Sequence, residues 1–111
     1  MEPLRFSIQP RKGGSTIALI APPFIDNTEL DQLIERLIAT IDTLNPPNVV
    51  LDLSKVEYIA SAMLGLLINL RQRINARQGR LVLAQMPRKL EEVIYTTSMH
   101  KLFTIVRDLP S

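Results

Sequence analysis

The sequence predicts an α/β fold, in which a mixed sheet of four to five strands begins with a hairpin and carries three to four helices. Short apolar runs alternate along the chain with longer segments whose apolar residues recur every three or four positions. Gly13-Gly14 separates the first two apolar runs, and a strand–helix–strand order follows later. The whole chain, residues 1–111, is expected to form a single domain.

The predicted hairpin opens the chain. In residues 5–10, Phe6 and Ile8 alternate with polar neighbours, which is typical of a half-buried strand. Gly13-Gly14 supplies the positive φ angles of a tight turn. A second strand covers residues 16–21 and ends at Pro22-Pro23, because proline cannot donate a hydrogen bond to a strand ladder.

A long amphipathic helix follows the hairpin. Asp26 is a polar residue suited to the N-cap, and Glu29 stands three positions after it. Asn45-Pro46-Pro47 ends the segment. Its apolar face comprises Leu30, Leu33, Ile34, Leu37, Ile38, Ile41 and Leu44.

The middle of the chain reads as a strand–helix–strand unit. Residues 49–53 are a nearly continuous apolar run, as in a central strand. A loop over residues 54–60 leads to a helix from Ser61 to about Arg77, and Gly79 is its C-cap. Residues 80–85 form the next strand. A short connection of this kind predicts that the two strands are parallel.

The last third of the chain contains smaller elements. Pro87 opens a third helix, since proline is tolerated in the first turn, and Leu90, Val93 and Ile94 give that helix an apolar face. A short turn or helix over residues 98–102 leads to a last strand, residues 103–106.

Composition excludes several classes of chemistry. The chain has no cysteine and one histidine, His100, so disulfides, thiol nucleophiles, cysteine-bound zinc and histidine-rich metal sites are ruled out. We therefore expect no metal and no cofactor. No nucleophile lies in a recognisable pattern with a base, and we expect that the chain is not an enzyme.

Charge and hydropathy indicate where in the cell the protein is expected and which classes of partner are not expected. Apolar runs fall short of the roughly 18 residues of a membrane span, so no direct membrane insertion is expected. The N-terminus lacks the basic region and apolar core of a signal peptide, which predicts a cytoplasmic protein. The net charge is +2, the aromatic content is 5%, and the basic residues are scattered; nucleic-acid binding is therefore not expected.

Ser61 stands out because it opens the second predicted helix. As an N-cap serine it would contribute about 1 kcal/mol to helix stability. As a phosphorylation site it would gain about −1.5 to −2 charges, which the free N–H groups and the dipole of the helix would tolerate. The two interpretations are compatible.

Three segments resemble the STAS domain family, of the anti-sigma factor antagonist type. Residues 49–67 are similar to its apolar strand ending in Asp-Leu-Ser, followed by a loop and by Asp-Ser-Ser/Ala-Gly-Leu-Gly at a helix start. Residues 79–84, followed by Pro87, also resemble the family, and residues 98–103 resemble its closing Gly-Leu-x-x-Leu-Phe. The resemblance covers essentially the whole chain and implies a single STAS-like domain over residues 1–111.

This resemblance implies a partner-switching mechanism in bacterial signal transduction and transcription regulation. The unmodified domain would bind an anti-sigma factor that is also a serine kinase, so that a sigma factor is freed. The kinase would phosphorylate Ser61 and weaken the complex, and a PP2C-type phosphatase would restore it. ATP would belong to the partner, and a homodimer is compatible with this scheme. The implied interface comprises Asp26, Asn27, Tyr58, Ile59, Ala60, Ser61, Ala62 and Met63.

Two positions depart from the family pattern. Ala60 stands where the family has an acidic residue, and Met63 stands where it has a glycine. For Ile59 and Met63, ordinary core packing is an equally good interpretation of their apolar spacing. The altered loop also fits a non-switching STAS subunit, either a scaffold of a signalling assembly or an accessory subunit of a lipid-transport ATPase.

Overall fold

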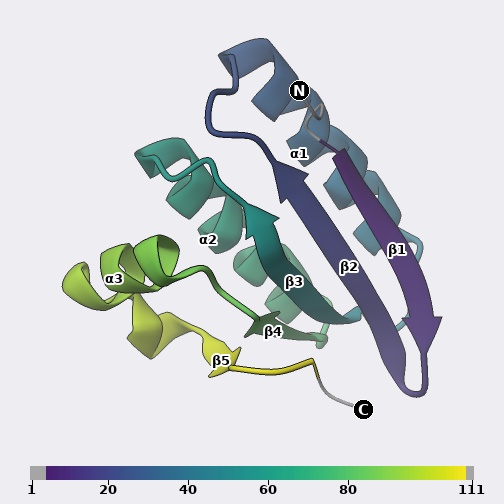
Figure 1. Cartoon of the computed structure of the whole chain (residues 1–111). Helices are drawn as coiled ribbons and strands as arrows, with labels where there is room; N and C mark the ends of the chain where they lie inside the picture. The colour runs from purple at the N-terminus through teal and green to yellow at the C-terminus, as the bar shows by residue number, and fades with distance from the viewer. Residues whose placement is uncertain (1–4, 110–111) are drawn as a thin grey trace.

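The computed structural model describes residues 5–109. Their strands form one five-stranded sheet in the order β1-β2-β3-β4-β5 (Figure 1). β1 and β2 form an antiparallel hairpin, and the other neighbouring strands run parallel. The predicted mixed sheet with its initial hairpin is therefore confirmed. The strands are β1 (Arg5–Arg11), β2 (Gly14–Ala21), β3 (Asn48–Val56), β4 (Arg80–Ala84) and β5 (Thr104–Val106).

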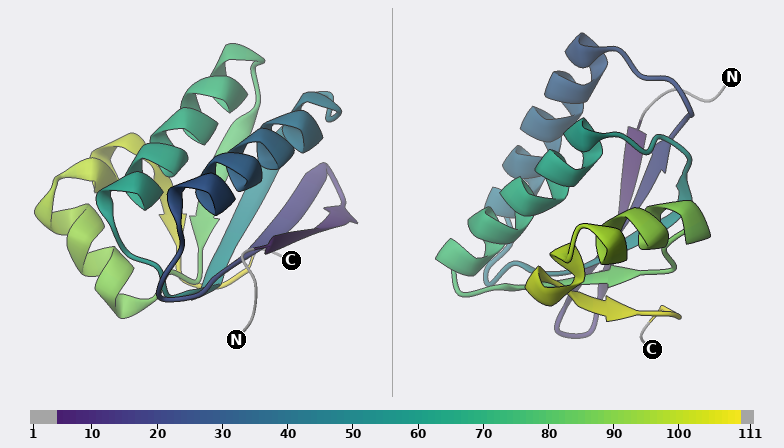
Figure 2. Two further views of the ribbon diagram at one scale, coloured as in Figure 1. Left: turned by 90° about the horizontal axis from the view of Figure 1, so that it is seen from above. Right: turned by 90° about the vertical axis from the view of Figure 1, so that its left-hand side faces the viewer.

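Three α-helices and one short 3-10 helix accompany the sheet, within the predicted number. α1 and α2 lie side by side over the same face of the sheet (Figure 2, left). α3 and the 3-10 helix η1 lie at the end of the sheet formed by β4 and β5 (Figure 1). The helices are α1 (Asn27–Asp42), α2 (Ser61–Ala76), α3 (Arg88–Thr96) and η1 (Met99–Leu102).

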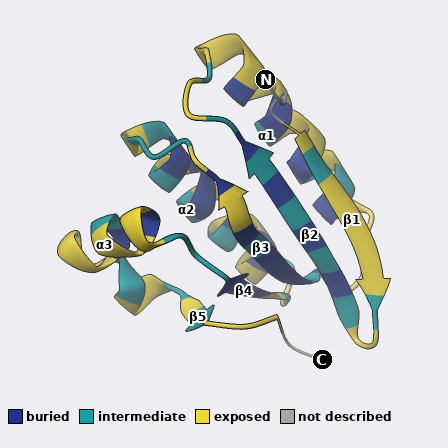
Figure 3. Cartoon of the chain, in the orientation of Figure 1, coloured by how far each residue is buried: buried dark blue, intermediate teal, exposed yellow. Residues whose placement is uncertain are grey.

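The core lies between the sheet and these helices, and its residues come from both layers. Figure 3 marks the buried residues in dark blue. In β2 every second residue is buried, and the residues between them are half-buried. This alternation follows from the strand period of two, because successive side chains point to opposite faces. The largest fully buried side chains are Ile17, Leu19, Leu33, Leu37, Ile41, Leu51, Leu53, Met63, Leu66, Leu67, Leu70 and Ile74.

β3 (Asn48–Val56) extends well beyond its predicted boundaries, residues 49–53. β3 continues to Val56, so that the loop before α2 is shorter than the predicted residues 54–60. The register with β2 shifts along this extension: Ala18 pairs with Asp52, whereas Ile20 pairs with Lys55. One extra residue of β3 is thus accommodated as a bulge, a feature that apolar spacing does not reveal.

The hairpin turn is tighter than predicted. Of the two turn glycines, Gly13 alone has a positive φ, of 80°, whereas Gly14 is already the first residue of β2. The side chain of Asn48, at the start of β3, donates a hydrogen bond of 3.1 Å to the carbonyl of Gly13. This bond fixes the turn against the neighbouring strand.

Candidate functional site

Two loops meet at the carboxyl ends of β2 and β3. The first covers residues 22–26 and leads into α1; the second covers residues 57–60 and leads into α2. The carbonyl of Ala21 accepts hydrogen bonds from the amides of Glu57, at 2.7 Å, and Tyr58, at 3.2 Å. Since parallel strands end at the same edge of a sheet, both loops lie at this edge (Figure 1). We call residues 22–27 and 57–62 the loop surface.

Ser61 is the first residue of α2 and is exposed. The predicted N-cap role is wrong by one position. Ala60 has the extended N-cap conformation, with φ −150° and ψ 168°, and its carbonyl accepts the amides of Met63 at 2.9 Å and Leu64 at 3.3 Å. A residue past the cap has helical backbone angles, so its side chain does not turn back to cap the helix.

The start of α2 has free donors. The amides of Ser61 and Ala62 make no backbone hydrogen bond to the described part of the chain, residues 5–109. α2 has 16 residues, and its first turn contains no acidic side chain. The partial positive charge of a helix N-terminus is therefore not offset by its own residues, and a negative group on Ser61 would be tolerated there.

Met63 is fully buried, which corrects its prediction as a partner-binding residue. It lies on the side of α2 that also buries Leu66, Leu67 and Leu70, because these positions follow one another at helical spacing. Core packing, the alternative interpretation, is the observed one.

The other predicted residues of the second loop remain at least partly accessible. Tyr58, Ile59 and Ala62 are partly buried hydrophobic residues that pack against the core, and Ala60 is half-buried. For Ile59, core packing and surface exposure therefore occur together.

Asp26 is the N-cap of α1, as the sequence predicted. Its Oδ1 accepts a hydrogen bond of 2.8 Å from the amide of Glu29. Asp26 also raises the pKa of the Glu29 carboxyl, first because a protonated Glu29 can share a hydrogen bond with Asp26 and second because the two negative charges repel. Asn27, the first residue of α1, is exposed beside it. Asp26 and Asn27 thus form the end of the first half of the loop surface, and their role toward a partner stays a prediction.

Replacing Asp26 with alanine should destabilise the fold by about 1 kcal/mol, because the amide of Glu29 loses its acceptor. The same variant should lower the pKa of Glu29 toward its ordinary value, since the two largest causes of the shift, the hydrogen bond and the charge repulsion with Asp26, disappear. Urea unfolding and an NMR titration of the Glu29 side chain measure the two effects. Asn27→Ala is the matched control and should leave the pKa of Glu29 raised; an unchanged pKa in Asp26→Ala would refute the assignment.

Phe24 was missed by the sequence analysis. Its side chain is 85% exposed in the loop between β2 and α1. Large aromatic side chains that are this accessible are common anchors of protein interfaces, where they fill a pocket of the partner. The available signal was an aromatic residue directly after Pro22-Pro23, outside any apolar period.

The described residues contain no group of three or more histidine, cysteine, aspartate or glutamate side chains that could hold a metal ion. His100 lies in η1, where its ring stacks on Tyr95 at a centroid distance of 4.4 Å. Within residues 5–109, no helix is both long and apolar enough to cross a membrane. The loop surface therefore offers two aromatic side chains, the exposed Phe24 and the half-buried Tyr58, together with small residues and the N-terminus of α2, an arrangement suited to contact with a protein and to carrying a phosphate.

Comparison with known proteins gives a consistent result. The model of the STAS domain family matches residues 12–111. No curated protein matches the chain. The fold is similar to that of an anti-sigma-factor antagonist (STAS) domain protein from Planctomyces limnophilus, with a TM-score of 0.79, 21% sequence identity, and coverage of 94% of this chain and 91% of that chain. A candidate anti-sigma factor antagonist from Thermotoga maritima has a TM-score of 0.74 and 20% identity, with coverage of 90% and 84%.

Proposed function

The chain belongs to the STAS domain family, and from this premise we propose that it is an anti-sigma factor antagonist, a protein-binding module that acts through the loop surface. Its partner is an anti-sigma factor with serine kinase activity, and the chain itself catalyses no reaction. Binding of the unmodified chain keeps the partner away from its sigma factor. The observation that carries the proposal is the exposed Ser61 at the start of α2, close to the rest of the loop surface.

Phosphorylation of Ser61 is the proposed switch. The added phosphate brings about −1.5 to −2 charges to a surface that already carries the exposed carboxylates of Asp26 and Glu57 and has no basic side chain. Inside the chain this charge is tolerated, because the free amides of Ser61 and Ala62 face it at the helix N-terminus. The partner, in contrast, must bury or repel the new charge. The fold therefore survives the modification while the complex dissociates, until a PP2C-type phosphatase removes the phosphate.

Ser61→Asp should weaken binding to a kinase-type anti-sigma factor by about tenfold or more, because an uncompensated charge is introduced into the interface. Ser61→Ala should bind as the unmodified chain does. Ser7→Asp, which places the same charge on the exposed strand β1, is the matched control and should have little effect. Titration calorimetry measures all three affinities, and equal affinities for Ser61→Asp and Ser7→Asp would argue against the switch.

Modification can also be tested without a purified partner. Peptide mapping of the protein taken from its native host should find a phosphate on the peptide that contains Ser61. A chain that stays unmodified through growth and stress would remove the phosphorylation step and leave the binding function to be tested by itself.

One observation favours a second candidate, constitutive binding as a scaffold or as an accessory subunit of a lipid-transport ATPase. The loop surface carries Ala60 directly before Ser61, and an alanine offers no carboxylate to a kinase. Light scattering separates the two candidates, because a scaffold should form large particles whereas a switch should remain small.

A further inference from the structure

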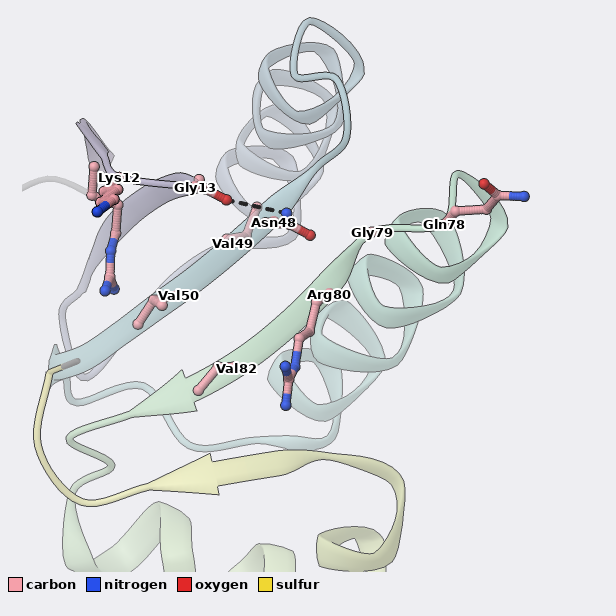
Figure 4. A pocket seen from close by; sticks show the side chains of 11 residues that line it. Lys12, Gly13, Asn48, Val49, Val50, Gln78, Gly79, Arg80 and Val82 are labelled. Atoms are coloured by element: carbon pink, nitrogen blue, oxygen red, sulfur yellow. Dashed lines mark hydrogen bonds between the residues drawn. The ribbon is translucent and has the colours of Figure 1, made fainter. Parts of the chain in front are cut away.

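An open trough lies at the opposite end of β3 from the loop surface. Its volume is about 710 Å³, and its lining comes from the hairpin turn, the start of β3 and the connection from α2 to β4 (Figure 4). Eight residue steps separate Asn48, in the trough, from Val56 near the loop surface, which corresponds to about 26 Å along the strand. The trough is therefore a separate place on the molecule, and the proposed function does not use it.

Two of the glycines that line the trough let neighbouring backbones approach closely. A Cβ atom on Gly14 would lie 2.3 Å from the carbonyl oxygen of Asn48, and one on Gly79 would lie 2.3 Å from that of Pro47. Neither position can hold a larger residue unless the backbone moves. The Asn48 side chain is held toward Gly13 by its hydrogen bond of 3.1 Å. These contacts hold together the three segments that line the trough, which are the hairpin turn, the start of β3 and the connection from α2 to β4.

Among residues 5–109, every charged side chain that lines the trough is a cation. Arg11 and Lys12 come from the hairpin and Arg80 from β4, and no acidic residue of this described range is part of the lining. The strand order sets the distance between the cations on the two sides of the trough. β1 and β4 are three strand spacings apart, which is about 14 Å. A concave surface that carries charges of one sign concentrates counter-ions, because its low-dielectric walls focus the field.

The floor between the cations is apolar. Val50 and Val82 are paired in the register of β3 and β4, and each lies two residues beyond the pair Asn48 and Arg80. Residues two apart share a face of the sheet, so these side chains and that of Arg80 are on the same side. Figure 4 shows Arg80 extending on the side of Val82. A ligand on this floor would meet methyl groups below and positive charge at its ends.

We propose that this trough binds a small phosphorylated organic molecule. Its phosphate is held by the cationic side chains, among which the planar guanidinium of Arg80 can form two parallel hydrogen bonds to phosphate oxygens. Its apolar part lies on Val50 and Val82. The volume is within the range of roughly 300 to 1,000 Å³ that small-molecule sites occupy.

The four glycines of the chain make a direct test. Gly13, Gly14 and Gly79 line the trough, whereas Gly65 lies in α2. Phenyl phosphate, titrated into the full-length protein at constant ionic strength, should shift the amide NMR signals of the three trough glycines in a saturable way and leave that of Gly65 in place. Inorganic phosphate should shift the same three signals with an affinity at least about threefold weaker, because it has no apolar part to bury.

Two variants of equal charge change complete the test. Arg80→Gln should weaken phenyl phosphate binding by about tenfold, since a charge-assisted hydrogen bond is lost. Arg88→Gln is the matched control and should bind as the unmodified protein does, because Arg88 is on α3, where it pairs with Glu92. The proposal is overturned if both variants bind equally, if inorganic phosphate binds as tightly as phenyl phosphate, if Gly65 shifts in place of the trough glycines, or if no signal saturates.

Discussion

Gly79→Ala is expected to destabilise the folded chain by about 1 to 3 kcal/mol, the usual cost of forcing extra atoms into a filled space. The added Cβ would lie 2.3 Å from the carbonyl oxygen of Pro47 and 2.5 Å from its Cγ. Both contacts involve a backbone or a stiff ring, so the start of β4 must move away from the start of β3. Urea unfolding followed by circular dichroism measures the loss.

Gly65→Ala provides the matched control for this variant. Gly65 lies within α2, is exposed, and would have no atom within 4 Å of an added Cβ. Alanine is the better helix former by up to about 1 kcal/mol, so this variant should be more stable than the natural chain. If both glycine variants shift the unfolding midpoint in the same direction, the close approach of β4 to Pro47 is not the cause.

Phe24→Ala is expected to weaken the proposed complex with an anti-sigma factor by about 30-fold, which corresponds to the 2 kcal/mol that defines an interface hot spot. The stability of the free chain should hardly change, because the side chain is 85% exposed and little of its contact area lies within the protein. Binding by surface plasmon resonance and thermal unfolding, measured on the same samples, separate the two effects.

Tyr95→Ala is the control for the loss of an exposed aromatic side chain. Tyr95 is 49% exposed on α3, outside the loop surface, and its removal should leave the affinity unchanged. An equal loss in both variants would mean that the partner covers a different part of the molecule from the one proposed.

Much of the fold could be predicted because most of its helices and strands have clear signals in their own local sequence. The helix after Asp26 has both an N-cap residue and an apolar period, and the structure places the helix and its cap where these signals do. The hairpin and the strand–helix–strand unit could be predicted equally well, since turn glycines and short connections leave few alternative topologies. The bulge in β3 was not, because it depends on which residues of β2 lie opposite.

The candidate site was harder to predict because it depends on single backbone angles and on neighbours distant in sequence. Whether Ala60 or Ser61 caps α2 is decided by the extended angles of one residue. Met63 could face the core or the solvent, since apolar residues occur on most sides of that helix start. Phe24 has no periodic context, and the trough joins three segments that only the sheet brings together.

The two hydrogen bonds that converge on the carbonyl of Ala21 have a kinetic consequence. They tie the loop before α2 to the end of the strand that leads into the loop before α1, so the two halves of the loop surface are ordered before any partner arrives. A preformed surface has little conformational entropy left to lose on docking, and no folding step delays the encounter. Association should therefore proceed with the ordinary protein–protein rate constant of about 10⁵ to 10⁷ M⁻¹s⁻¹. Variants that change the affinity should do so mainly by changing the dissociation rate constant of the complex.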